Sequence, residues 1–337
     1  MMIKWCKETL FSWARELGFA EAALCSADDF EEERIAIEHQ PPIRERAQLR
    51  FYPAQEHPQV KSLAVLLWAY RPARIEGGDR IFVDSYYDAS NAAYHAAREL
   101  EHRANSAGGL VRANVAYPAR EAAVRAGMGI IGRNGLLITP QYGSRVAIIL
   151  LATDLPVPND GVRKDDCAQC DGCGRCEKAC PLNAIDSEGM SHPERCMRNF
   201  MMEGVVAPEE ARARMGMRLI GCDICQRVCP MQRELPCDAH ESMRLDDFMT
   251  LDESRFAGAV ALLAGRIGRN TARPQRVRAQ AALLAGNLRD TKHLPVLEEW
   301  ANSPFEVVRE HARWAIKRIR EAGLRGGAGL DRSDKTR

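Results

Sequence analysis

Long apolar runs are missing from the 337-residue sequence. One of the longest, VAIILLA at residues 146–152, is far short of the ~20 residues that a membrane-spanning helix needs. The opening residues, MMIKWCKETLFSWAREL, carry Lys4, Lys7 and Glu8 where a signal peptide would be apolar. They predict an amphipathic helix instead, and we therefore expect a cytoplasmic protein with no membrane partner.

An excess of charge of one sign and clustered catalytic groups are also missing. The formal net charge is +1, so the overall balance points to no class of partner. The eight histidines form no cluster, and no local pattern of paired carboxylates or of Ser, His and Asp occurs. These residues alone predict no acid–base or nucleophilic site.

Cysteine, by contrast, is abundant. Without an export signal, twelve cysteines indicate thiolate chemistry in a reducing compartment rather than a disulfide framework. Eight of them fall into two blocks with one cysteine between the blocks. The pattern is Cys170-x2-Cys173-x2-Cys176-x3-Cys180-Pro181, then Cys196, then Cys222-x2-Cys225-x3-Cys229-Pro230.

The first block has the spacing of bacterial ferredoxins with two clusters, in which the fourth cysteine ligates the other cluster. Two [4Fe–4S] clusters are therefore predicted. Cluster one is assigned to Cys170, Cys173, Cys176 and Cys229, and cluster two to Cys180, Cys196, Cys222 and Cys225. Zinc is the alternative, because it also binds four cysteines, but this crossed spacing has no zinc-ribbon equivalent.

The remaining four cysteines are not needed for this count. Cys167 is interpreted as a bystander thiol, with a substitute ligand as the alternative, and Cys237 is interpreted in the same way. Cys6 and Cys25 lie in an expected helix and strand, where cysteine is usually a small buried hydrophobe.

Residues 1–160 alternate between helical and strand patterns, which predicts an α+β or α/β domain with a central sheet. Helices are expected at 3–17, 91–107 and 121–126. Strands are expected at 20–25, 60–70, 135–139 and 145–152. Residues 161–245 are expected to form a ferredoxin-like insert carrying both clusters.

The C-terminal part has an internal repeat. VRAQAALLAGNL from Val277 returns as VREHARWAIKRI from Val308, which predicts HEAT-like helical repeats over 246–325, followed by a disordered tail over 326–337.

The same region is rich in basic residues: from residue 266 onward the sequence has 16 Lys and Arg but only 8 Asp and Glu. Such a basic stretch suits a phosphate backbone, and a solvated surface is the alternative. The crowded arginines are Arg266, Arg269, Arg273, Arg276 and Arg278.

The segment AGMGIIGRN contains Gly127-x-Gly129-x-x-Gly132, formally a dinucleotide-binding fingerprint. That fingerprint must follow a strand and open a helix. Here a helical pattern precedes it and a strand pattern follows it, so the order is reversed. We interpret the glycines as allowing the backbone to approach a bulky flat ligand.

Together these segments resemble the cobalamin-dependent epoxyqueuosine reductases, which complete the queuosine base in tRNA. The resemblance is carried by AVRAGMGIIGRNGLLITPQYGS, CDGCGRCEKACP, the ERC around Cys196, GCDICQRVCP and VREHARWAI. It covers most of the chain. The cysteine blocks alone are common, but their combination with the glycine segment and a helical repeat is specific.

The resemblance implies a base-off cobalamin next to the two clusters and a tRNA anticodon stem-loop as the substrate. It also implies an external electron donor, and we expect a monomer. Carried onto this sequence, the cobalamin contacts would be Arg50, Tyr94, Asn134, Gly135, Leu136, Leu137, Ile148 and Asp223.

One departure from the family concerns its proton-donating aspartate. An ungapped count places Ala113 there, and the catalytic group is therefore unknown, with Asn114 and Tyr117 as candidates. An amide cannot donate a proton as an acid does. Two alternative functions remain: the same cofactors acting on a small molecule, as in reductive dehalogenation, or an electron carrier without chemistry of its own.

Overall fold

The structure is a computed structural model that describes residues 4–42, 46–157, 170, 172–186, 192–232, 235–237 and 242–327. They form two compact units, each assembled from separated stretches of the chain. The first contains residues 1–72, 85–195 and 223–237, and the second contains 73–84, 196–222 and 238–337. The second cysteine block is therefore divided between the units, because the boundary falls after Cys222.

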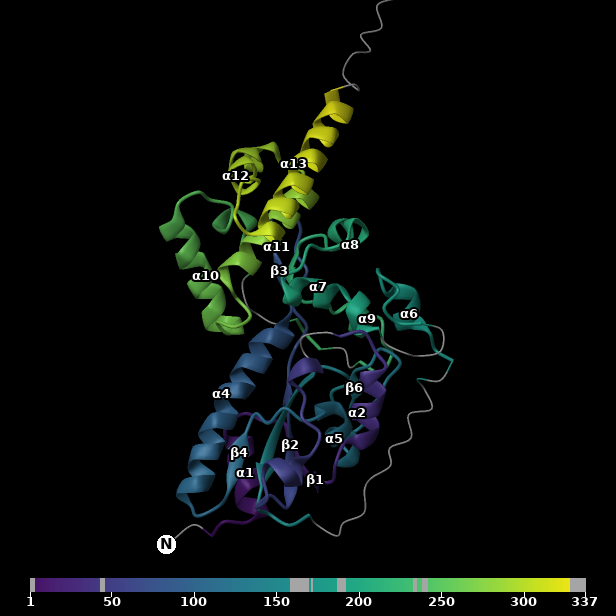
Figure 1. Cartoon of the computed structure of the whole chain (residues 1–337), viewed down its shortest axis with the longest axis vertical. Helices are drawn as coiled ribbons and strands as arrows, with labels where there is room; N and C mark the ends of the chain where they lie inside the picture. Colours follow the sequence, from purple (N-terminus) through teal and green to yellow (C-terminus); the bar gives the residue numbers. More distant parts are fainter. Residues whose placement is uncertain are drawn as a thin grey trace, which may run out of the picture. The chain divides into compact units, whose positions relative to one another are not determined.

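A four-stranded sheet is the centre of the first unit (Figure 1). Its order is β1 (Glu21–Ser26), β2 (Ser62–Ala69), β7 (Val146–Thr153) and β4 (Val111–Ala113). Each of the three neighbouring pairs is antiparallel. The mixed fold expected from the sequence is confirmed. Because the strands pair antiparallel, the unit belongs to the α+β class rather than to the α/β class, whose sheets are mainly parallel.

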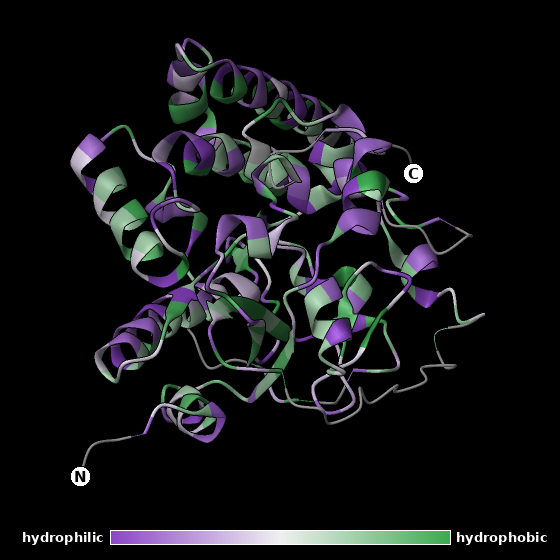
Figure 2. Ribbon diagram, turned by 60° about the horizontal axis from the view of Figure 1, so that its bottom comes forward, coloured by the Kyte–Doolittle hydropathy of each residue, from purple (hydrophilic) through white to green (hydrophobic). Residues whose placement is uncertain are grey.

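Strand β2 is buried on both faces. Leu63, Val65 and Leu67 join one apolar cluster, whereas Ala64 and Leu66 join another on the opposite face. Successive side chains of a strand point to opposite faces, so a continuous apolar run is what a sheet covered on both sides requires. Figure 2 shows these strands in green, whereas the helices carry both colours.

Helices cover the two faces. α1 (Lys7–Glu16) and α4 (Ser85–Ser106) supply the residues of one cluster, and α5 (Ala119–Arg125) supplies residues of the other. The first unit also contains these short elements: α2 (Glu31–Glu38), η1 (Arg46–Gln48), α3 (Pro53–Glu56), β5 (Ile130–Ile131), β6 (Leu137–Ile138), α6 (Arg175–Ala179) and α9 (Ile224–Arg227).

The expected elements all occur, with shifted ends. The helix expected at 91–107 begins earlier, at Ser85. The sequence did not reveal this start, because the polar and aromatic residues of the first turns hide the apolar periodicity. The strand expected at 135–139 is only Leu137–Ile138, which pairs with β5 as a small separate hairpin. α5 before the glycine segment and β6 after it confirm the reversed order that argues against dinucleotide binding.

The second unit combines a small parallel strand pair with a helical region. Its elements are β3 (Phe82–Val83), β8 (Arg218–Ile220), α7 (Met197–Glu203), α8 (Glu209–Arg214), η4 (Leu245–Asp247), α10 (Glu253–Ile267), α11 (Pro274–Leu288), η5 (Thr291–His293), α12 (Leu294–Trp300) and α13 (Glu306–Gly327). η3 (Pro193–Arg195) precedes α7 in the chain and belongs to the first unit. In the described part of the chain, no helix has both the length and the apolar character needed to cross a bilayer.

The repeated segments form α11 and α13, which pack against each other. At Gly286 of α11, an added Cβ would lie 2.8 Å from the Cα of Ala315 on α13. Ala281 and Ala312, which occupy equivalent places in the repeat, are both fully buried. Small residues at these positions allow the two helix backbones to approach closely.

His311 of α13 is buried completely and tied to two backbone groups. Its Nε2 accepts the N–H of Ala207 at 3.1 Å, so its Nδ1 carries the proton that faces the carbonyl of Ala279, also at 3.1 Å. Burial lowers the pKa of His311 to about 4, and the hydrogen bond to Ala279 only partly opposes this. The neutral ring therefore joins α11, α13 and the segment before α8.

This histidine should make stability depend on pH. Its pKa is lower in the folded chain, so the unfolded chain binds more protons between pH 6.5 and about 4. The contribution of His311 to the free energy of unfolding is complete above pH 6.5 and is about 2 kcal/mol smaller at pH 5. Urea unfolding of the chain and of His311→Gln should show a smaller pH dependence for the variant. Equal slopes would contradict the assignment.

Candidate functional site

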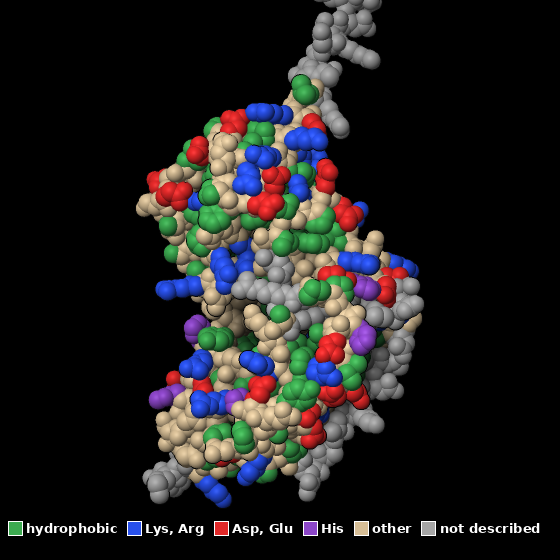
Figure 3. Space-filling model, viewed as in Figure 1, with side chains coloured by type: hydrophobic (Ala, Val, Ile, Leu, Met, Phe, Trp, Pro, Cys, Tyr) green, Lys and Arg blue, Asp and Glu red, His purple; other side chains and the backbone are tan. Residues whose placement is uncertain are grey.

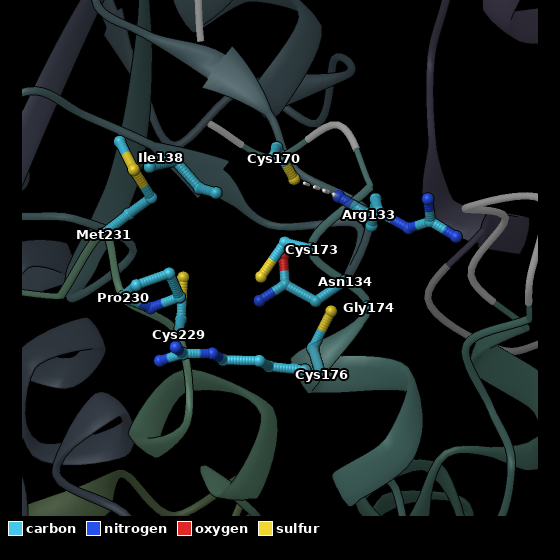
Figure 4. Close-up of a pocket in the computed structure, with 11 residues that line it drawn as sticks. Arg133, Asn134, Ile138, Cys170, Cys173, Gly174, Cys176, Cys229, Pro230 and Met231 are labelled. Atoms are coloured by element: carbon cyan, nitrogen blue, oxygen red, sulfur yellow. Dashed lines mark hydrogen bonds between the residues drawn. The ribbon is translucent and has the colours of Figure 1, made fainter. Parts of the chain in front are cut away.

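Four cysteines gather around one hollow in the first unit. Cys170, Cys173 and Cys176 of the first block meet Cys229 of the second, and all four line the same pocket. Figure 4 shows their sulfur atoms arranged around a common space. Including its open mouth, this four-cysteine pocket has a volume of about 340 Å³. The residues assigned to cluster one from their spacing are thus together.

Glycines shape the chain around the first three cysteines. Gly172 and Gly174 have φ angles of 71° and 62°, in the left-handed region where glycine pays no steric cost. Gly174 precedes α6, which carries Cys176 on its first turn. The Cys-x2-Cys-x2-Cys spacing therefore lets the chain wrap one side of the pocket.

Cys229 is held in place by the central sheet. Three residues before it, Gln226 donates to the carbonyl of Ser144 at 2.9 Å and to the hydroxyl of Tyr70 at 3.1 Å. Three residues after it, Gln232 donates to the Ser144 hydroxyl. A Cβ at Gly143 would lie 2.8 Å from the carbonyl oxygen of Met231, so the two segments are in close contact. Ser144 thereby fixes both sides of Cys229.

The sequence analysis missed Gln226, Gln232 and Ser144. Their roles depend on a pairing of segments more than eighty residues apart, as between Ser144 and Gln232. Ser144 ends the AVRAGMGIIGRNGLLITPQYGS stretch that carried the family resemblance, and this was the one signal that could have singled it out.

The thiols influence one another. Burial raises the pKa of Cys176 and of Cys229, and the neighbouring cysteines of the pocket raise both further. A positively charged metal group would offset this effect at Cys176 and Cys229, because it binds the thiolate form.

A four-cysteine zinc site and a four-iron cluster require different separations between the thiol sulfurs. Four sulfurs at about 2.3 Å from one zinc ion would lie about 3.8 Å from each other. Within the described ranges, no three His, Cys, Asp or Glu side chains are close enough to hold one metal ion. A four-iron cluster instead receives each thiolate on a different iron atom, which places the sulfurs further apart.

The cysteines assigned to cluster two occur in both units. Cys180 and Cys225 belong to the first unit, whereas Cys196 and Cys222 belong to the second. Cys180 ends α6, and its sulfur accepts the N–H of Ala184 at 3.2 Å. Cys225 lies on α9, Cys196 precedes α7, and Cys222 follows β8.

The other cysteines differ in environment. Cys25 is buried in the sheet, and burial raises its pKa to about 12, so it is an inert core residue as expected. The Cys6 sulfur is 3.3 Å from the Thr9 hydroxyl. Cys237 is exposed. Cys167 lies outside the described residues.

The glycine segment packs against its own hairpin. An added Cβ at Gly129 would collide with the carbonyl of Ile138, and one at Gly132 would collide with the Ile138 side chain. The expectation that these glycines make room for a flat ligand is therefore wrong for these two positions. They allow the chain to fold back on β6, which turns the next residues toward the four-cysteine pocket.

The predicted cobalamin contacts that follow this segment have different surroundings. Asn134 lines the four-cysteine pocket. Gly135 has a φ angle of 71°, and its carbonyl accepts a hydrogen bond from Arg120. Leu136 is half-buried, whereas Leu137 is buried in the core beneath the sheet.

The more distant predicted contacts are spread over the first unit. Arg50 is exposed and Ile148 is half-buried on β7. Tyr94 of α4 is 48% exposed, which leaves its ring available to a ligand. Asp223 is fully buried and lies 2.8 Å from Arg227 and 3.7 Å from Arg145, so its carboxylate is engaged in ion pairs within the fold.

The position of the missing aspartate and the two candidates for the proton donor have different surroundings. Ala113 ends β4 and packs against the cluster formed by α1, α4 and the sheet. Tyr117 is buried, its hydroxyl faces Glu56 at 3.4 Å, and burial raises its pKa, so its proton is tightly held. Asn114 has a φ angle of 58° and donates to the carbonyl of Tyr94 at 3.5 Å. Asn114 thus contacts the predicted cobalamin contact Tyr94, whereas Tyr117 lies near another, Arg50, whose N–H bonds the carbonyl of Ala116.

The crowded arginines of the C-terminal region do not act as one surface. Arg276 is buried and donates to the carbonyls of Asn270 and Thr271 at 3.0 and 2.7 Å. Arg278 bonds Glu253 at 2.8 Å and lies 4.3 Å above the ring of Phe256. The expectation of a continuous basic cluster is therefore wrong at these two positions.

The remaining surface of this region has mixed charge. Figure 3 shows acidic and basic side chains interspersed over the visible face of α12 and α13. Arg320, for example, pairs with Glu298 at 2.6 Å. Arg269 and Arg273 are exposed in the loop between α10 and α11, where a phosphate could reach them.

Residues 169–232 match the 4Fe-4S double cluster binding domain. The epoxyqueuosine reductase of Lactococcus garvieae (strain Lg2) is 32% identical over 208 residues, covering 58% of this chain and 57% of the relative. That of Bacillus subtilis (strain 168) is 29% identical over 210 residues, covering 59% and 53%. The matched region thus spans about half the length of these curated relatives.

Solved structures extend the likeness to nearly the whole chain. An epoxyqueuosine reductase with an epoxyqueuosine-modified tRNA stem loop has a TM-score of 0.77 and 24% identity, covering 98% of this chain and 95% of that one. The chain has the fold of the epoxyqueuosine reductases. The enzyme of Streptococcus thermophilus agrees, with a TM-score of 0.72 and 23% identity over the same shares.

The expected resemblance to epoxyqueuosine reductases is thereby confirmed. The double-cluster match includes all eight cysteines of the two predicted ligand sets and excludes Cys167 and Cys237. This supports the interpretation of those two thiols as bystanders.

Proposed function

We propose that this chain is a cobalamin- and iron–sulfur-dependent oxidoreductase that converts epoxyqueuosine to queuosine in tRNA, in the cytoplasm. The observation that carries the proposal is the four-cysteine pocket, built on a fold that matches an epoxyqueuosine reductase over 98% of the chain. The proposal retains the expected division into a cobalamin-binding domain, a double-cluster insert and HEAT-like repeats. It also retains an external electron donor and a monomeric state.

The metal assignments belong to this proposal. Cys170, Cys173, Cys176 and Cys229 would hold cluster one. Cluster two would be held by Cys180, Cys196, Cys222 and Cys225. Bound cobalamin would supply a low-valent, nucleophilic cobalt for opening the epoxide.

The protein itself would position the cofactors and the substrate and would exclude water from the site. Tyr94 and Asn114 lie in contact and would border the substrate, and Asn134 would connect the cobalamin site with cluster one. Asp223 would act through its ion pairs by fixing the start of α9, which carries Cys225. Arg50, Gly135, Leu136, Leu137 and Ile148 complete the proposed cobalamin contacts.

A second candidate keeps both cofactors and changes the substrate to a small molecule. It is favoured by one observation: Ala113, the ungapped equivalent of the family's aspartate, is apolar and packs into the core. The position has no acid, and its side chain is partly buried against this cluster.

Nucleosides from tRNA separate the two candidates. Cells lacking this gene should accumulate epoxyqueuosine at the expense of queuosine, and the intact gene should reverse the change. A nucleoside profile that is the same with and without the gene would favour the small-molecule substrate. Anaerobic reconstitution with iron, sulfide and cobalamin should also yield a base-off corrinoid spectrum, and failure to retain the corrinoid would favour the electron carrier.

Two exposed arginines should contribute to tRNA binding. Replacing both Arg269 and Arg273 by alanine should lower the affinity for tRNA. The slope of log K against the logarithm of the salt concentration should become smaller in magnitude by about 2, because two phosphate contacts are lost. Arg276→Ala is the matched control. It removes a buried guanidinium bonded to backbone carbonyls, so it should destabilise the fold by about 2 kcal/mol and leave the salt slope unchanged. An unchanged slope in the double variant would contradict a role for this loop.

A further inference from the structure

Asn134 has a hydrogen-bond donor that its own chain does not use. Its Oδ1 accepts the N–H of Leu136 at 3.2 Å, which fixes which end of the amide is oxygen. The Nδ2 is buried and has no hydrogen-bond partner among the residues that the structure describes. A buried amide donor left unpaired is unfavourable, because it has lost its hydrogen bonds to water. Such a group indicates an acceptor that the described residues do not supply.

The unused donor faces the four-cysteine pocket. Asn134 lines this pocket together with all four thiols. Figure 4 shows its amide directed into the space bounded by Cys173, Cys176 and Cys229. None of these three described thiol sulfurs accepts its hydrogen bond. The acceptor would therefore be carried by what the thiols hold.

The glycine segment fixes this orientation. A Cβ at Gly132 would lie 3.1 Å from the Oδ1 of Asn134 and would collide with Ile138, which also lines the pocket. Gly132 therefore permits the turn that brings the Asn134 side chain inward. The same turn directs the backbone N–H of Arg133 to the sulfur of Cys170 at 3.4 Å. Two consecutive residues thus present N–H groups to one site.

We propose that the Asn134 side chain donates an N–H···S hydrogen bond to a sulfide of cluster one and thereby raises its reduction potential. The inference rests on the proposed function only in requiring cluster one. Reduction adds one electron, taken from an external donor, and makes the sulfurs more negative. A donor beside them stabilises the reduced form more than the oxidised form. Asn134 is in this sense a tuning residue that makes cluster one easier to reduce.

Two variants of the full-length protein with both clusters test the proposal. Asn134→Asp keeps the oxygen that accepts from Leu136 and removes the donor, whereas Asn134→Leu removes the donor without adding charge. Gln141→Leu, at an exposed position, is the control. Redox titration followed by EPR should show cluster one of Asn134→Leu shifted to a more negative potential. A tenfold loss in the reduction equilibrium would be about 59 mV. Asn134→Asp should shift it further, and Gln141→Leu should not shift it.

The unaltered protein provides a second readout. With asparagine labelled by ¹⁵N in its side chain, pulsed EPR of the reduced cluster should detect a coupled nitrogen, and absence of this coupling would overturn the proposal. An unchanged potential in both variants at full iron content would also overturn it, while leaving the proposed function intact. A chain that binds no iron after reconstitution would overturn the proposed function itself, together with this inference.

Discussion

Replacing Cys229 with alanine is expected to remove about half of the bound iron and to lower the proposed reductase activity by at least about 10²-fold. Cys229 is the one cysteine of the second block that lines the four-cysteine pocket. Without it, cluster one would lose the ligand that closes the site opposite the first block. The measurement is iron per chain together with EPR of the reduced protein, followed by turnover of epoxyqueuosine tRNA.

Cys237→Ala is the matched control for this variant. It removes an exposed thiol close by in the sequence and outside the double-cluster match, so iron content and activity should be unchanged. A Cys229→Ala protein that retains its full iron content would show that the ligand assignment is wrong. Equal losses in both variants would point to general damage rather than to a ligand.

Changing Asn114 to aspartate is expected to raise the rate of the proposed epoxide opening by about 10²-fold. Opening the ring leaves an alkoxide that needs a proton, and a positioned acid typically contributes 10²–10⁴-fold. Aspartate tolerates the left-handed backbone of Asn114, whose φ angle is 58°. A protonated carboxyl could also donate to the Tyr94 carbonyl as the amide does, which would favour the acid form.

The neighbouring residue provides a control for this gain. Ala113→Asp would place a carboxylate against the core cluster beneath α4, so it should destabilise the protein and give no increase in rate. Single-turnover kinetics of the two variants, with equal iron and cobalamin content, compare them directly. If Asn114→Asp reacts no faster than the unaltered chain, another group or a water already delivers the proton.

The local elements were predictable because their patterns are physical consequences of burial. The run VKSLAVLLWAY predicted a strand buried on both faces, and β2 is such a strand. Its antiparallel pairing was not predictable, since a doubly buried apolar run occurs in parallel and antiparallel sheets alike. The helical repeat was found because Ala281 and Ala312 recur in the same pattern, and both are buried between α11 and α13.

The site was predictable only where sequence spacing encodes geometry. Three closely spaced cysteines must lie on one loop. The crossed pattern added Cys229 to these three, and in the structure all four line one pocket. Spacing could not distinguish Arg276 from Arg273, because one is buried against carbonyls and the other is exposed by the tertiary packing alone. Gln226 and Ser144 were likewise invisible, since their hydrogen bond joins distant segments.

The bonds of Ser144 to Gln226 and Gln232 have a consequence for biogenesis. These bonds position Cys229, which is translated long after Cys170. A nascent chain that ends before Cys229 therefore has only three of the four thiols that line the pocket. Iron delivered to it would be bound incompletely and exposed to oxygen. We therefore expect the proposed cluster one to be assembled only after the segment that carries Cys229 has docked against Ser144, so that folding of this late segment would precede metal loading.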